Sequence, residues 1–114
     1  MKTVDEFVAQ YVGEQNAWLT TFVEFMRESY PEVPETIAYQ KPTYKFPKTH
    51  IAFSVAKNHF TFHTPDVESI EELKSILPLA KFGKGSAKVK FVDKSAQPVL
   101  MSVIDSIVER HAES

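Results

Sequence analysis

Residues 51–63 constrain the fold more tightly than any other stretch of the chain. Two runs in which apolar and polar side chains alternate, 51–56 and 59–63, flank Lys57-Asn58. Two-residue turns of this kind join antiparallel strands, and asparagine tolerates the positive φ that such turns require. We therefore expect a β-hairpin whose turn is Lys57-Asn58.

The turn fixes which residues of the two strands pair. Because side chains alternate along a strand, this pairing also assigns each residue to one of the two faces of the hairpin. The apolar residues fall together on one face: Ile51, Phe53, Val55, Phe60 and Phe62. The other face is small, polar and rich in histidine: His50, Ala52, Ser54, His59, Thr61 and His63. We expect the first face to be core and the second to be exposed.

Helical patterns flank the hairpin on both sides. Residues 3–6 match a capping box, which predicts a short helix to about Val12 with Gly13 placed to end it. Apolar spacings of three and four predict further helices over 15–30, over 67–77 and from Pro98 onward. Strands are expected at 37–46, with a bulge or break around 40–42, and at 87–91. A basic glycine turn at 81–86 precedes the latter strand. The prediction is one α+β domain spanning 1–114, with element order ααβββαβα and a small, mostly antiparallel sheet packed on one face by helices.

Composition narrows the function classes. The chain has no cysteine, which excludes disulfides and thiolate chemistry and fits a reducing compartment. No apolar run approaches membrane-spanning length and the first residues are not those of a signal region, so a cytoplasmic protein without a membrane partner is expected. Charge is uneven: residues 1–38 carry seven acids against two bases, whereas 39–64 carry four lysines and no acid. We expect a polarised surface, with the alternative that these charges serve only solubility.

Two clusters could hold a metal ion. Glu24, Glu28 and Glu32 follow one helix and its end, and a row of carboxylates with retained water suits a weak, exchangeable divalent cation such as Fe(II). In the expected register His50 lies diagonal to His63 on one face, close enough to share a metal. A solvated acidic helix face and exposed histidines that titrate near neutrality are the plainer interpretations.

A third candidate is a basic, aromatic surface for an acidic protein partner. It consists of residues from the strand segments: Tyr39, Lys41, Tyr44, Lys45, His59, Lys88 and Lys90. The chain has only two arginines, Arg27 and Arg110, and few bidentate donors argue against sequence-specific nucleic-acid binding. A homodimer through an exposed sheet edge is a further expectation. Motifs for serine, zinc or dinucleotide chemistry are absent from the sequence, so we do not expect an enzyme.

The order of elements and several short motifs resemble the YdhG-like family of small bacterial domains. The motifs are residues 34–39, Pro42-Thr43-Tyr44, Lys57-Asn58-His59, and Gly83-Lys84-Gly85-Ser86 before Val89 and Phe91. The markers carried over are Tyr39, Pro42, His59 and Gly85. This chain has Gln40 and Thr61 where the family usually has glycine. The family is mostly uncharacterised; one branch is described as a frataxin-like intracellular iron chaperone, and the resemblance therefore implies delivery of ferrous iron.

Overall fold

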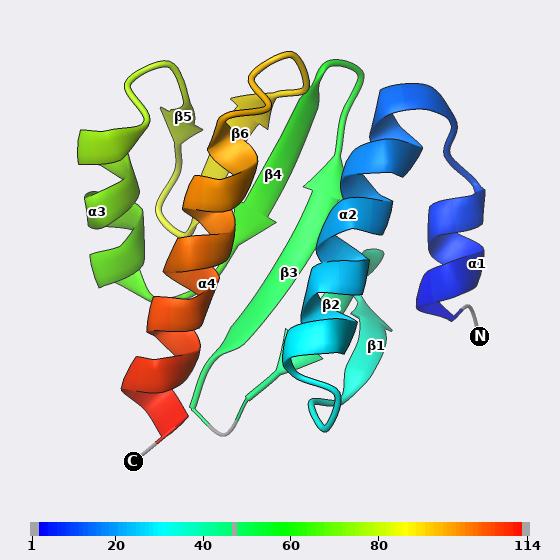
Figure 1. Ribbon diagram of the computed structural model, residues 1–114, viewed down its shortest axis with the longest axis horizontal. Coiled ribbons are helices and arrows are strands. Elements are labelled where there is room, and N and C mark those ends of the chain that lie inside the picture. Colours follow the sequence, from blue (N-terminus) through cyan, green and yellow to red (C-terminus); the bar gives the residue numbers. More distant parts are fainter. Residues whose placement is uncertain (1–2, 47, 113–114) are drawn as a thin grey trace.

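The protein is built from two layers, a six-stranded sheet and four helices that all cover the same face of it (Figure 1). The computed structural model describes residues 3–46 and 48–112. The helices are α1 (Val4–Ala9), α2 (Gly13–Ser29), α3 (Val67–Ile76) and α4 (Ala96–Ala112). The strands are β1 (Glu35–Ala38), β2 (Lys41–Lys45), β3 (His50–Val55), β4 (His59–His63), β5 (Lys81–Phe82) and β6 (Ser86–Lys90). The predicted α+β class with helices on one face is confirmed.

The strands lie in the order β1-β2-β3-β4-β6-β5, and every described pair is antiparallel. The predicted register of the central hairpin is confirmed: Val55 pairs with Phe60 and Ala52 with His63. The apolar face of this hairpin, expected to be core, lies under α2 and α4, and Phe53, Phe60 and Phe62 are completely buried.

Two details of the strands were predicted wrongly. The segment expected as one strand with a bulge or break is two strands, β1 and β2, joined by a tight turn at Tyr39-Gln40. Both turn residues have positive φ, 52° and 61°, which is the backbone of a twisted two-residue hairpin turn. Asn58, in contrast, is not among the described residues with positive φ. Lys81-Phe82, expected as part of a turn, forms the short edge strand β5.

The helices begin and end close to the predicted positions. The capping box of α1 is present, with Thr3 Oγ1 accepting from the amide of Glu6 and Glu6 Oε1 accepting from the amide of Thr3. Helix α1 ends at Ala9, earlier than predicted, and Gly13 is not the residue that ends it. Gly13, at φ 61°, is the first residue of α2.

Aromatic side chains fill the space between the layers. Phe22 on α2 stacks on Phe60 of β4 with ring centroids 4.6 Å apart. Trp18 is buried beside them, and its indole N–H donates to the carbonyl of Phe91 at 3.2 Å, so α2 is attached to the end of β6. The helix layer is therefore held firmly against one face of the sheet, and the other face is left uncovered by helices. Within the described residues no helix is long and apolar enough to cross a membrane.

Candidate functional site

The uncovered side of the sheet is the candidate site, and we call it the outer face. Strand pairing places these residues on it: Thr36, Ala38, Lys41, Thr43, Lys45, His50, Ala52, Ser54, His59, Thr61, His63, Lys81, Ser86, Lys88 and Lys90. None of these strand residues is acidic. Glu35, the one acidic residue in the described strands, pairs with the buried Tyr44 and so faces the helices. The outer face therefore has a single sign of charge.

Like charges meet directly on this face. Lys81 of β5 pairs directly with Lys88 of β6. Opposed like charges on neighbouring strands destabilise a sheet. Within residues 3–46 and 48–112, no ion pair links these lysines to a carboxylate. The pairing costs stability, and no ion pair of the described residues offsets the cost, which is typical of a functional surface.

One end of the outer face is hollowed. Here the β1–β2 turn, strands β2 to β4 and Gly85 surround a shallow depression with a volume of about 530 Å³. Gly85 belongs there because its backbone carbonyl accepts from the amide of Thr64 at 3.0 Å, and a Cβ at this position would lie 2.8 Å from the carbonyl oxygen of Thr64. Lys41, Lys45 and His50 lie on its lining with His63.

His63 is a neutral histidine within this basic surface. Burial lowers its pKa to about 4, and the positive charges of Lys41 and His50 add to the effect. Its Nε2 lies 2.9 Å from the hydroxyl of Ser54, so one ring nitrogen already has a partner. The plainer expectation of exposed histidines titrating near neutrality is wrong for His63.

The predicted partner-binding residues are on the outer face or at its edge, with one exception. Lys41, Lys45, Lys88 and Lys90 are strand residues of the face, as is His59, and Tyr39 lies at its rim in the β1–β2 turn. Tyr44 was wrongly included. It is 2% exposed, belongs to the core, and donates its hydroxyl to Glu35 Oε2 at 2.7 Å on the helix side.

The side chains predicted as metal ligands do not form a larger cluster. Glu24, Glu28 and Glu32 are exposed on α2 and in the segment after it, and His50 and His63 lie on the opposite side of the sheet. In the part of the chain that the structure describes, no group of three or more histidine, aspartate or glutamate residues could hold a metal ion. The diagonal placement predicted for His50 and His63 on one face does follow from the observed register.

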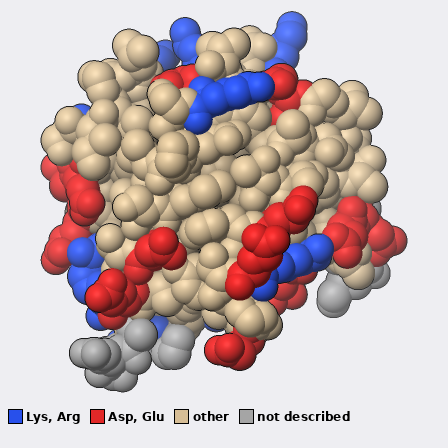
Figure 2. All heavy atoms as spheres, viewed as in Figure 1, with Lys and Arg blue, Asp and Glu red and all other residues tan. Residues whose placement is uncertain are grey.

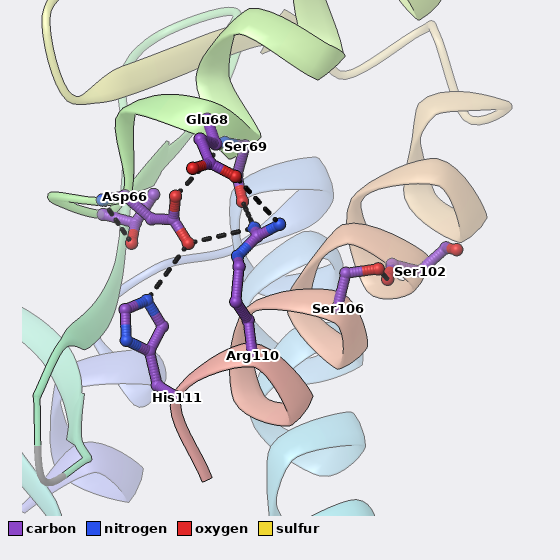
Figure 3. A network of polar contacts seen from close by, with 8 residues as sticks. Asp66, Glu68, Ser69, Ser102, Ser106, Arg110 and His111 are labelled. Atoms are coloured by element: carbon purple, nitrogen blue, oxygen red, sulfur yellow. Dashed lines mark hydrogen bonds and ion pairs between the residues drawn. The ribbon is translucent and has the colours of Figure 1, made fainter. Parts of the chain in front are cut away.

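A second polar cluster lies where α3 meets the end of α4 (Figure 3). Arg110 donates to Asp66 Oδ2 at 3.0 Å and to the hydroxyl of Ser69 at 2.8 Å, and His111 Nε2 lies 3.3 Å from the same carboxylate oxygen. Burial acts to raise the pKa of Asp66, but hydrogen bonds from Arg110 and the Ser69 amide outweigh it, and the pKa is lowered. Asp66 also accepts from the Ser69 amide as the cap of α3, so the cluster fastens two helices together. Sequence reasoning did not find it, since its members are far apart in the chain.

The fold and the outer face together define a small α+β domain with one uncovered, basic sheet surface. Among solved structures, the chain is similar to a protein of the DUF1801 family, YdhG from Bacillus subtilis, with a TM-score of 0.81 and 16% sequence identity over 97% of this chain and 92% of that one. The resemblance to YdhG-like domains is thus confirmed at the level of the fold. No family model matches the sequence, and no curated protein matches it either.

Proposed function

We propose that this chain is a non-catalytic binding domain whose outer face binds an acidic partner protein. The observation that carries the proposal is the single sign of charge on that face, where Lys88 opposes Lys81 and the described strand residues include no carboxylate. A bound acidic surface would relieve the repulsion between these side chains. Charge complementarity of this kind speeds association and selects partners.

The character of the basic groups favours a protein over a nucleic acid. Both arginines are on the helix side, Arg27 paired with Asp5 and Glu35, and Arg110 with Asp66 and Glu68, so neither can serve as a bidentate donor on the outer face. Among the described large apolar side chains that are exposed, Tyr39 alone is aromatic. Base stacking along a single strand normally uses several such rings. Lysines, as mobile point charges, suit a carboxylate-rich protein surface.

Iron delivery, which the resemblance implies, gains no support from the described side chains. A cation would meet repulsion on the outer face, and the acidic side chains of α2 form no group of three ligands there. An anaerobic Fe(II) titration followed by two-dimensional amide NMR tests this alternative.

The proposal is tested by two-dimensional amide NMR with a short polyglutamate peptide as the probe. We expect saturable shifts at amides of β4, β5 and β6, and an affinity that falls steeply as salt is raised from low to physiological concentration. The variant Lys88→Gln with Lys90→Gln should weaken binding about tenfold. Its control, Lys74→Gln with Lys94→Gln, removes the same charge from the helix side, where both lysines pair with glutamates.

Three results would count against the proposal. Shifts confined to α1–α4 would place binding on the wrong side of the molecule. Equal weakening in the two double variants would show that only net charge matters. Tighter binding of an oligothymidine probe than of polyglutamate would make the outer face a nucleic-acid surface instead.

A further inference from the structure

The depression at one end of the outer face has the dimensions of a small-molecule site. Its volume of about 530 Å³ falls within the range of ligand clefts in proteins, roughly 300–1,000 Å³. It is formed by residues of β1 to β4 and of four connections between elements. It also combines an apolar lining with a few polar groups, which is the composition usual for such clefts.

The charged groups of the depression select an anion. Lys41 and Lys45 line it from β2, and no aspartate or glutamate is among its described lining residues. Within the described residues, the ammonium group of Lys41 makes one weak contact, at 3.5 Å, with the backbone carbonyl of Tyr39, and neither Lys41 nor Lys45 is in an ion pair. Both lysines are thus available to a negatively charged group that enters from solvent.

The apolar part of the lining selects a ligand with an apolar body. Ala38, Phe46, Ala52 and Pro65 contribute to it. Tyr39 lies at the rim, 92% exposed, with φ at 52°. A bulky residue rarely adopts this backbone conformation, and a tight turn is better served by asparagine or glycine. The ring contributes nothing to the core, so core packing does not account for a tyrosine at this position.

A buried hydroxyl gives a second indication. Thr49, only 8% exposed, lies in the wall of the depression, and its Oγ1 has no hydrogen-bond partner within the described residues. Buried polar atoms normally have partners, and an exception calls for an explanation. A polar ligand atom seated against this wall would supply the missing partner.

We infer that the depression binds a small organic anion that carries a flat apolar body, such as an aromatic carboxylate. The anionic group pairs with the ammonium group of Lys41, which lies by the β1–β2 turn, and the positive charge of Lys45 further along β2 adds attraction. The apolar body lies over Ala52 and against the ring of Tyr39. This inference does not rest on the proposed function, because it uses the lysines of β2 and not those of β6.

The test uses benzoate as the probe, followed by two-dimensional amide NMR. Acetate supplies the charge without the ring, and benzamide supplies the ring without the charge. We expect saturable shifts around the β1–β2 turn and the neighbouring ends of β3 and β4, with an affinity for benzoate about tenfold higher than for either control. Shifts elsewhere, or equal affinity for benzoate and acetate, would overturn the inference.

Paired variants separate this site from the rest of the outer face. Lys41→Gln with Lys45→Gln should weaken benzoate binding about tenfold, whereas Lys88→Gln with Lys90→Gln should leave it unchanged. Tyr39→Asn should weaken it about fivefold while thermal stability is kept or raised, because asparagine suits the turn. Equal effects of the two lysine pairs would argue for nonspecific attraction. Polyglutamate binding can be absent while benzoate binding is present, so the two experiments test the two proposals independently.

Discussion

The two sides of this molecule handle charge in opposite ways. On the helix side, Arg27 contacts Asp5 and Glu35, and Arg110 contacts Asp66 and Glu68. Figure 2 shows this side, where several basic side chains touch acidic ones. On the outer face the lysines of β2, β5 and β6 have no carboxylate partner among the described ion pairs, and Lys81 directly opposes Lys88.

This difference separates what holds the fold together from what is offered to a partner. The paired charges of the helix side connect elements: Arg27 ties α2 to α1 and to β1, and Arg110 ties α4 to the start of α3. Among the described residues, the lysines of the outer face form no ion pair that connects one element to another. A variant on the helix side should therefore change stability, and one on the outer face should change binding with little loss of stability.

Glu35→Ala should give the largest effect. Glu35 accepts from Arg27 through two nitrogens, at 2.7 and 2.9 Å, and from the hydroxyl of Tyr44 at 2.7 Å. Its removal leaves the Tyr44 hydroxyl buried without a partner, which costs about 2 kcal/mol in free energy of unfolding. Denaturant unfolding followed by tryptophan fluorescence measures the loss.

Two comparisons sharpen this prediction. Asp5→Asn, which alters only the exposed partner of Arg27, should cost less than about 0.5 kcal/mol. In a Tyr44→Phe background Glu35→Ala should cost clearly less than it does alone, because no unpaired hydroxyl remains. Equal costs in both backgrounds would show that Tyr44 and Glu35 do not depend on each other.

The second prediction concerns His63 and pH. The folded pKa is lowered to about 4 from an ordinary 6.5, so the unfolded chain takes up the proton first as pH falls. The contribution of His63 to the free energy of unfolding is therefore fully present above about pH 6.5 and is lost progressively down to about pH 4. For a half-buried ring this loss is about 2 kcal/mol. His63→Gln should flatten the stability profile in this window, measured by urea unfolding at a series of pH values.

Asp66 provides an internal reference for that profile. Its pKa is lowered as well, so its contribution is present above the ordinary carboxyl range and is lost as pH falls below about 3.8. Asp66→Asn should therefore change the profile mainly at the acid end, below the window of His63. An unchanged slope between pH 6.5 and 4 in His63→Gln would contradict the assignment to His63.

The sequence predicted the structure correctly where the turn residues and the alternation of apolar and polar side chains indicated the same register. A two-residue turn and strict alternation both pointed to one register for β3 and β4, and a slip by one residue would have mixed apolar with polar side chains. The outer face followed from the same alternation. The capping box of α1 was equally local, since both of its hydrogen bonds join residues three apart.

The prediction failed where a residue is in a backbone state that its type does not favour. Tyr39 and Gln40 have positive φ although neither is glycine or asparagine, so their turn was interpreted as a break within one strand. The apparent switch of faces between Ile37 and Tyr44 was the missed signal. Because the turn at residues 39–40 pairs Ile37 with Pro42 and Glu35 with Tyr44, Ile37 and Tyr44 both face the helices.

The depression could not be found from sequence for a different reason. Its lining comes from segments as distant as Ala38 and Gly85, and only the strand order brings them together. The pair formed by Lys81 and Lys88 was not predicted either, because β5 is only two residues long and its residues were expected in a turn.

The smallest expected effect tests the outer face itself. Lys88→Glu replaces a repulsion with Lys81 by an attraction and also places a carboxylate beside Thr61, so the protein should become more stable by about 0.5 kcal/mol. Lys74→Glu, on the exposed surface of α3, is the matched control; it breaks the contact with Glu71 and should cost a few tenths of a kcal/mol. Both changes are measured as midpoints of urea unfolding. A gain in Lys88→Glu together with weaker polyglutamate binding would mean that the native lysine is kept at a cost in stability for the sake of binding, whereas a loss of stability would show that the lysines of β5 and β6 are not in conflict.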